Sequence, residues 1–181
     1  MSSVESALVV LVPEAEALVK SFRDRYDPSA AVGVPAHITL LYPFKRPNEV
    51  SRAVLEKLRD GFARFAAIQF SLSSVRRGSR SGTLYLAPEP DEPFRRLTMA
   101  IWGWYPETPP YGGSWLPDIV PHLTVAQPAE EQERERITEE FAQASQGKLP
   151  IHATASEVTL MDNRSGRWQI STTLSLGHAL D

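Results

Sequence analysis

Hydrophobic and polar residues alternate over several short stretches of this chain, and this period of two predicts β-strands. The clearest example is 68–75, where Ile, Phe, Leu and Val alternate with polar neighbours and indicate a half-buried strand. The apolar run at 6–12 is bounded by Pro13 and indicates a buried strand. The predicted strands are 6–12, 36–42, 68–75, 83–87, 119–126, 151–161 and 167–176, with a turn at 162–166 between the last two.

Four longer segments are predicted to be helices. Pro13 suits a first helical position, and Glu14 and Glu16 favour the positive end of a helix dipole. Asn48 and Asp91 are side chains that can cap the two helices that follow them. The predicted helices are 13–25, 49–65, 92–104 and 129–145.

The predicted elements occur twice in the same order. Residues 4–76 and 82–161 each give strand, helix, strand, helix, strand, and 167–176 adds a closing strand. Sequence identity between these halves is low, so the repeat rests on the order of the elements and on the residues in each middle strand. A chain of 181 residues suits one compact unit, and we expect residues 1–181 to form a single α+β domain.

Composition narrows the chemistry that this chain can perform. It contains no Cys, which excludes disulfide bonds, thiolate zinc sites, iron–sulfur clusters and a cysteine nucleophile. Its formal net charge of −3 argues against binding of nucleic acid through a large positive field. A small anionic ligand held by a few well-placed groups is still compatible with this charge.

No targeting or membrane segment is recognisable. The longest apolar run, 7–13, is far too short to cross a bilayer, and residues 1–5 lack the basic start of a signal peptide. We therefore expect a cytoplasmic protein without membrane contact, and we expect it to be a monomer. The acidic stretch 130–140 is interpreted as a solvated helix face.

Each middle strand carries a histidine followed two residues later by a threonine, at 37–39 and at 122–124. Because residues i and i+2 of a strand point to one face, each histidine projects together with its threonine while the residue between them enters the core. If the two halves pack about an approximate two-fold axis, these side chains face one another across a cleft. They are His37, Thr39, His122 and Thr124.

Two imidazoles and two hydroxyls in one cleft can open a phosphodiester. In-line displacement at phosphorus needs a base for the attacking oxygen and an acid for the leaving oxygen. Histidines with a pKa of about 6.5 can take both roles near neutral pH, one neutral and one protonated. The hydroxyls can donate to the non-bridging oxygens. His37 and His122 are therefore candidate catalytic residues, and Thr39 and Thr124 are candidate phosphate ligands.

Other interpretations of these residues stay open. The histidines can instead be buried side chains bonded to the backbone, and threonine favours strands in any case. Two imidazoles fall short of the three protein ligands usual at catalytic zinc, so no metal or other cofactor is expected. Tyr42, Tyr111 and Trp115 flank the motifs and can stack a base, although packing is the commoner role of such aromatics.

A third copy of the tripeptide lies at 152–154 and has no counterpart in the first half. It is interpreted as the polar face of a strand, with His152 as a further candidate for the cleft wall. Arg76, Arg77 and Arg80 are interpreted as solubilising residues of a loop between strands, and guidance of a phosphate is the alternative.

The paired motifs and the residues around them resemble the 2H phosphoesterase family, which includes bacterial 2′-5′ RNA ligase-like proteins and cyclic phosphodiesterases. The likeness covers nearly the whole chain and points to the small bacterial branch of the family. The resemblance implies a bilobal, pseudo-two-fold fold in which antiparallel sheets line a central cleft and helices lie outside. The segments that carry it are 35–44, 109–113, 121–126 and 157–160, together with Trp168.

The resemblance also implies an activity. His37 and His122 would act as acid and base, with His122 favoured as the base, and Thr39 and Thr124 would bind the phosphate. The implied substrate is a nucleoside or oligonucleotide 2′,3′-cyclic phosphate or a related RNA-type diester, hydrolysed without metal. The alternatives are joining or cleavage of 2′-5′-linked RNA ends, and a module that binds RNA ends or a cyclic nucleotide without turnover. Ala36 stands where some relatives carry a basic residue, which argues against ligation of long RNA.

Overall fold

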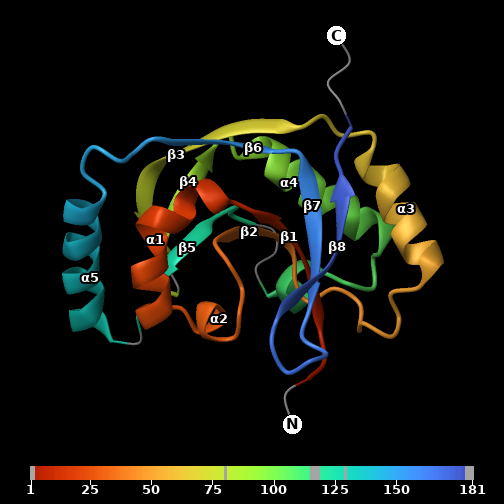
Figure 1. Ribbon diagram of the computed structural model, residues 1–181, viewed down its shortest axis with the longest axis horizontal. Helices are drawn as coiled ribbons and strands as arrows, with labels where there is room; N and C mark the ends of the chain where they lie inside the picture. The colour runs from red at the N-terminus through yellow and green to blue at the C-terminus, as the bar shows by residue number, and fades with distance from the viewer. Residues whose placement is uncertain (1–2, 80, 115–118, 129, 178–181) are drawn as a thin grey trace.

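The computed structural model describes residues 3–79, 81–114, 119–128 and 130–177. In these residues eight strands form one antiparallel sheet, with helices packed against it (Figure 1). The strands are β1 (Ser6–Leu11), β2 (His37–Leu41), β3 (Ile68–Arg77), β4 (Leu84–Glu89), β5 (Leu123–Ala126), β6 (Ile151–Ala155), β7 (Glu157–Asp162) and β8 (Gln169–Ser175). The helices are α1 (Pro13–Tyr26), α2 (Pro28–Ala31), α3 (Arg52–Phe62), α4 (Glu92–Trp104) and α5 (Glu131–Ala144), with a 3-10 turn η1 (Pro110–Gly113).

The sheet has two lobes of four strands each. Its strand order is β6-β3-β4-β5-β2-β1-β7-β8, which is symmetric about the contact between β5 and β2. These two strands are joined through a single residue pair, Ile38 with Leu123. The predicted bilobal α+β fold with antiparallel pairing is confirmed. The two sheets expected from the sequence are linked at this point into one.

The lobes do not follow the halves of the sequence. Strand β3 ends the first predicted half but pairs with β4 and β6, and β7 from the second half pairs with β1. The helices cross over in the same way, because α1 packs on β5 while α4 packs on β2. The sequence repeat 4–76 and 82–161 stays a prediction, but neither half contains a complete lobe.

The strand predicted at 151–161 is two strands. Strand β6 ends at Ala155 and pairs with β3 in one lobe, and β7 begins at Glu157 and pairs with β1 in the other (Figure 1). Ser156 therefore lies where the chain passes from one lobe to the other. Apolar residues occupy 151, 153 and 155 before the break and 158 and 160 after it, so the alternation changes phase across the polar pair Ser156 and Glu157, and this shift is the sequence sign of the break.

Helix α3 begins later than predicted because its cap is a different residue. The hydroxyl of Ser51, and not Asn48, accepts the N–H of Val54 at 3.3 Å. Near the other end of the helix, Gly61 lies directly under the indole of Trp104 on α4, and a Cβ at this position would clash with that ring. The glycine therefore allows α3 and α4 to approach closely.

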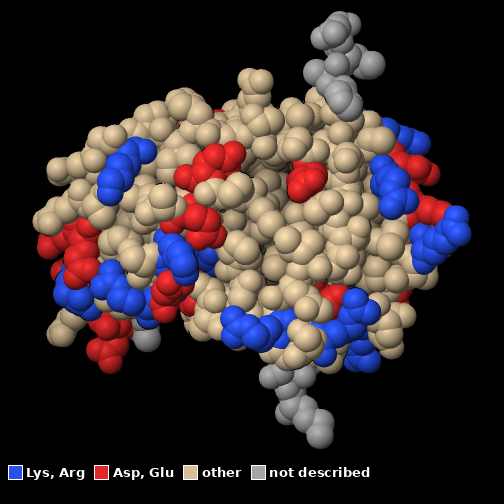
Figure 2. Space-filling view, in the orientation of Figure 1, with Lys and Arg blue, Asp and Glu red and all other residues tan. Residues whose placement is uncertain are grey.

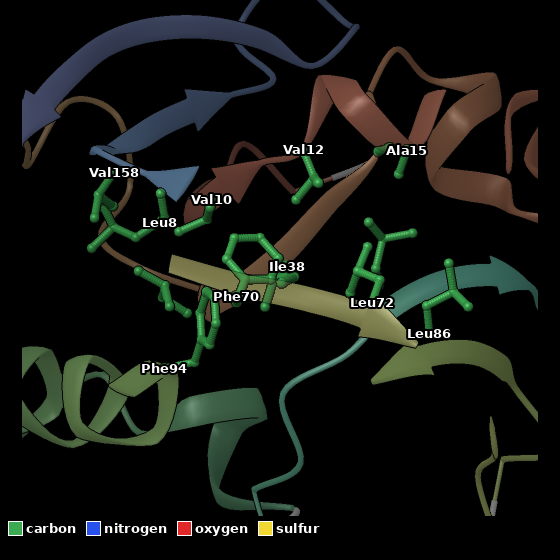
Figure 3. Packing of buried hydrophobic residues seen from close by; sticks show 14 of the residues in the cluster. Leu8, Val10, Val12, Ala15, Ile38, Phe70, Leu72, Leu86, Phe94 and Val158 are labelled. Carbon is green, nitrogen blue, oxygen red and sulfur yellow. The ribbon is translucent and has the colours of Figure 1, made fainter. Parts of the chain in front are cut away.

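The main core lies between the sheet and the helices (Figure 3). Phe70 of β3 and Phe94 of α4 meet there edge to face, with ring centroids 5.0 Å apart, a geometry worth about 0.5–1.5 kcal/mol beyond the area it buries. On the opposite side of the sheet, Ala7, Val9 and Met161 belong to a second, smaller apolar cluster. Strand β1 is thus buried on both faces, which explains its continuous apolar sequence.

Candidate active site

The two His-x-Thr motifs meet at the centre of the sheet. Their middle residues, Ile38 and Leu123, pair across β2 and β5 and are fully buried in the main core. Because the strands are antiparallel, the residue before Ile38 lies opposite the residue after Leu123, and the residue after Ile38 lies opposite the residue before Leu123. Each histidine therefore lies opposite the threonine of the other motif. Cβ atoms of such opposed residues lie about 4.5–5.5 Å apart, and diagonal neighbours lie about 7–8 Å apart. The opposed pairs are His37 with Thr124 and His122 with Thr39.

Both imidazoles are anchored in the same way. Nδ1 of His37 lies 2.8 Å from the carbonyl oxygen of Pro35, and Nδ1 of His122 lies 2.7 Å from that of Val120. A carbonyl oxygen only accepts, so Nδ1 carries the proton and donates it. Nε2 is then the unprotonated nitrogen of each neutral ring, available to take up and release a proton. In both cases the acceptor is the carbonyl two residues before the histidine, so the two rings are held by the same local geometry.

The four motif residues line one cleft of about 360 Å³. Ala7, Val9 and Met161 of the smaller apolar cluster form part of its surface, and Trp168 and Tyr42 contribute an aromatic wall. The two aromatic rings contact each other edge to face, with centroids 6.0 Å apart. The four polar motif residues thus lie beside an apolar and aromatic surface, a combination typical of sites for small organic ligands.

Burial lowers the pKa of both histidines. The pKa of His37 decreases to about 4, because the charged ring loses hydration. The bond to the Pro35 carbonyl and the charge of Asp27 oppose this decrease. The charges of Arg23 and His122 add to it. Burial also lowers the pKa of His122, again opposed by its backbone bond and by Asp27. Both rings are therefore mainly neutral at pH 7 when the cleft holds no anion.

Tyr111 is held against Thr39 by an unusual backbone conformation. Its φ of 52° lies in the left-handed region, which is strained for a side chain of this size. The backbone N–H of Tyr111 donates to the carbonyl of Tyr42 at 2.6 Å and ties η1 to the end of β2. Burial raises the pKa of the Tyr111 phenol, and its hydrogen bond with Thr39 works in the opposite direction. The strain is thus stored beside a candidate phosphate ligand.

A buried ion pair borders the cleft at the junction of α1 and α2. Nε of Arg23 donates to Asp27 at 2.9 Å, and both side chains are almost completely enclosed. Asp27 also accepts from the N–H and the hydroxyl of Ser29, while Arg23 donates to the carbonyl of Val34. This network fixes the chain that leads into β2, and with it the position of His37.

Of the other predicted site residues, two line the cleft, one does not, and one lies outside the described residues. Tyr42 lines the cleft, and its hydroxyl donates to Glu5 at 2.6 Å; burial, followed by this bond, raises its pKa to about 12. Tyr111 also lines the cleft, and Trp115 lies outside the described residues. His152 does not line it: this side chain is exposed on β6 and borders a separate shallow depression with Glu14. The reason is that β6 is the outermost strand of its lobe.

The arginines singled out in the sequence form surface contacts. Arg76 lies 3.8 Å from Glu89. Arg77 donates to the hydroxyl of Thr138 and lies 3.6 Å from Glu131 of α5. Both placements support the solubilising interpretation, and Arg80 lies outside the described residues. Figure 2 shows acidic and basic side chains mixed over α5, as expected of a solvated helix face.

Several residues of this region were not predicted from the sequence, among them one carboxylate and two aromatic side chains. Asp27 and Trp168 line the cleft, and the ring of Tyr85 on β4 packs edge to face against His122 with centroids 5.5 Å apart. Tyr85 stands between two buried leucines, and this alternation indicates that it faces the side of the sheet that carries the histidines. Asp27 is placed by local contacts, since it caps α2 ahead of Pro28, and this cap signal is present in the sequence. For Trp168 the placement depends on contacts between distant segments.

Within residues 3–79, 81–114, 119–128 and 130–177, no three His, Cys, Asp or Glu side chains are grouped so that they could hold a metal ion. None of the helices in these ranges has the length and apolar character needed to cross a membrane.

The family match, together with the paired His-x-Thr motifs, supports a phosphoesterase-type enzyme. The sequence matches the family model of the 2′-5′ RNA ligase superfamily over residues 11–167, and the chain belongs to this family of 2H phosphoesterases. Membership points to phosphodiester hydrolysis or ligation as the class of reaction.

Solved structures share the fold at low sequence identity. TT0787 of Thermus thermophilus is 17% identical, with a TM-score of 0.62 over 97% of this chain and 100% of that chain. Escherichia coli LigT complexed with NADP+ is 16% identical, with a TM-score of 0.59 over 98% of this chain and 100% of its own. LigT complexed with 3′-AMP is also 16% identical, with a TM-score of 0.58 over 97% and 99%. No curated protein sequence matches the chain.

Proposed function

We propose that this protein hydrolyses the 2′,3′-cyclic phosphate of a nucleoside or short oligonucleotide to a phosphomonoester without a metal ion. The observation that carries the proposal is the register of β2 and β5, which sets each histidine opposite the threonine of the other motif. A phosphate between the two diagonal imidazoles has a nitrogen on either side, as in-line displacement requires.

The reaction is a displacement of a ribose oxygen by water. His37 takes a proton from water on Nε2 while the water oxygen forms a bond to phosphorus; its pKa of about 4 keeps this ring neutral, which supports His37 as the base and reverses the assignment that the resemblance favours. The bond between phosphorus and the 2′ or 3′ oxygen breaks, and the protonated His122 donates its Nε2 proton to that oxygen. The backbone bonds of both rings keep Nδ1 protonated throughout, so proton transfer is confined to Nε2. The two roles exchange if the substrate binds in the opposite orientation.

Thr39 and Thr124 act on the non-bridging oxygens. Their hydroxyls are fixed by the strand backbone, so donation to oxygens that gain charge in the transition state needs little reorganisation. Tyr111 of η1 lines the cleft together with Thr39. Trp168 and Tyr42 offer a surface for the nucleoside.

The test is hydrolysis of a panel of phosphodiesters by the purified protein in the presence of EDTA. The panel holds the four nucleoside 2′,3′-cyclic phosphates, a 2′-5′-linked dinucleotide and an RNA pair with ends suited to joining, with products separated by chromatography. Hydrolysis of cyclic phosphates in EDTA is the expected result. Turnover of only the 2′-5′-linked compounds would replace the proposal by cleavage or ligation, and binding without turnover would replace it by a recognition module.

A further inference from the structure

The cleft has few charged groups, and their charges largely cancel. Among its described lining residues none is Lys or Arg, and Asp27 is the one carboxylate. The charge of Asp27 is matched by Arg23 at 2.9 Å within the protein, so this pair adds no net charge to the cleft. The phenols of Tyr42 and Tyr111 have raised pKa values and are neutral near pH 7.

Charged groups on the neighbouring elements are already engaged. Glu5, which directly precedes β1, accepts a hydrogen bond from the hydroxyl of Tyr42. In the turn between β7 and β8, Arg164 pairs with Asp162 at 2.8 Å. The guanidinium of Arg167 donates to the carbonyl of Ala31 at 3.2 Å and is not part of the lining; it keeps its charge, which solvent screens because the side chain is exposed. Tyr85, which packs on His122 from β4, is uncharged. A proton on one imidazole is therefore the main source of positive charge for a bound anion.

From this charge distribution we infer that the cleft selects phosphate groups with a single negative charge, and rejects ligands with a second charge on the same phosphate or a second phosphate group. The inference rests on the proposed function for the position of the phosphate between His37 and His122. One imidazolium neutralises one charge, and an additional charge in a half-enclosed cleft is left without a partner.

This selectivity separates substrate from product. A 2′,3′-cyclic phosphate is a diester with one negative charge, whereas the monoester formed from it has a second pKa of about 6 and is mostly doubly charged above neutral pH. Opening of the ring thus converts a matched ligand into a mismatched one. Nucleotides with an additional 5′-phosphate are disfavoured for the same reason, so the substrate class is a nucleoside cyclic phosphate without further phosphates.

The test compares two inert nucleotides that differ by one methyl group and one charge. These are a 2′-deoxynucleoside 3′-(methyl phosphate), which is singly charged, and the same 2′-deoxynucleoside 3′-phosphate. Their affinities for the full-length protein are measured by titration calorimetry at about pH 8 and about pH 5. At about pH 8 the diester is expected to bind on the order of tenfold more tightly than the monoester. The preference should disappear at the lower pH, where the monoester carries one charge and more of the imidazoles are protonated.

Gln127 offers a matched pair of variants, because its exposed side chain lines the cleft outside the proposed machinery. Gln127→Lys adds a cation and should reduce the diester preference about threefold, whereas the neutral Gln127→Met should not change it. Equal or tighter binding of the monoester at pH 8 overturns the inference. Failure of both nucleotides to bind overturns the inference and the proposed function together. A diester preference in a protein that hydrolyses no cyclic phosphate overturns the proposed function alone.

Discussion

Ile38 pairs with Leu123 at the single point where the two lobes of the sheet join. Both residues are fully buried, so a slip of one residue would move them to the cleft and move the histidines into the core. The apolar residue inside each His-x-Thr motif therefore sets the register that brings the two motifs together. The same two tripeptides specify the site and the centre of the core.

Alanine in place of His37 or His122 should abolish most of the activity while leaving the fold intact. Loss of a general acid or base costs on the order of 10²- to 10⁴-fold in rate. The measurement is kcat with a nucleoside 2′,3′-cyclic phosphate, with circular dichroism and thermal unfolding to verify folding.

His152→Ala is the matched control for these variants. This histidine belongs to the third copy of the tripeptide but is exposed on β6, outside the cleft. Its replacement should leave kcat unchanged. A loss with His152→Ala equal to that with the other two variants would contradict the proposed site.

Valine in place of Thr39 or Thr124 should have a smaller effect than loss of a histidine. Valine keeps the shape of threonine and removes only the hydroxyl, and a hydrogen bond to a charged group is worth about 1.5–3 kcal/mol. This corresponds to a decrease of roughly 10- to 100-fold in kcat/KM. Thr154→Val on β6 is the control, and an equal decrease there would speak against a role in phosphate binding.

The pH dependence should follow the lowered pKa values of the histidines. Burial lowers the pKa of His37 to about 4 and lowers that of His122 below its usual value. One ring must be neutral and the other protonated, and a protonated ring becomes rare above these lowered pKa values, so kcat/KM should peak below about pH 6.5 and decrease as the pH rises. A bound anionic phosphate raises the imidazole pKa, so kcat should persist to higher pH. A kcat/KM maximum above about pH 7.5 would contradict this electrostatic picture.

The sequence was sufficient to predict the parts of the site that lie within single strands. His37 and Thr39 share a face because the strand period is two, and the same holds for the second motif. The strand order was not accessible in this way. Nothing local to β3 or β7 indicates that these strands pair with β4 and β1, because such pairing is decided by packing over the whole sheet.

The rest of the cleft depends on long-range contacts of this kind. Trp168 reaches the cleft because its N–H donates to the carbonyl of Val32, more than a hundred residues earlier in the chain. The exclusion of His152 has the same origin, since β6 is the outermost strand of its lobe. Periodicity describes the faces of a strand but not its partners.

Phenylalanine in place of Tyr111 should reduce kcat/KM while the protein keeps its stability. The change removes the hydroxyl that bonds Thr39 but keeps the ring and its backbone anchor on Tyr42. A decrease of about 5- to 10-fold is expected from loss of one neutral hydrogen bond. Tyr105→Phe is the control, because that hydroxyl donates to Val54 away from the cleft. Full activity of Tyr111→Phe would show that Thr39 needs no orientation by the phenol.

Breaking the Arg23–Asp27 pair should destabilise the protein strongly. Both charges are nearly inaccessible to solvent, so removal of one leaves the other buried without a partner, at a cost of about 3–5 kcal/mol. Arg23→Met and Asp27→Asn should each show this loss in urea unfolding. Asparagine keeps the side-chain oxygen that caps α2 at Ser29, so the Asp27 variant reports mainly on the charge.

The double variant separates pairing from packing. With both charges removed, no buried ion is left without a partner. The double variant should therefore lose less unfolding free energy than the two single variants lose together. Lys20→Met provides the control on the same helix: Lys20 pairs with Asp24 at 2.8 Å with both side chains exposed, and its loss should change the unfolding midpoint very little. Additive losses in the double variant would mean that each side chain acts through its packing and local bonds. The buried pair would then not be an electrostatic unit beside His37.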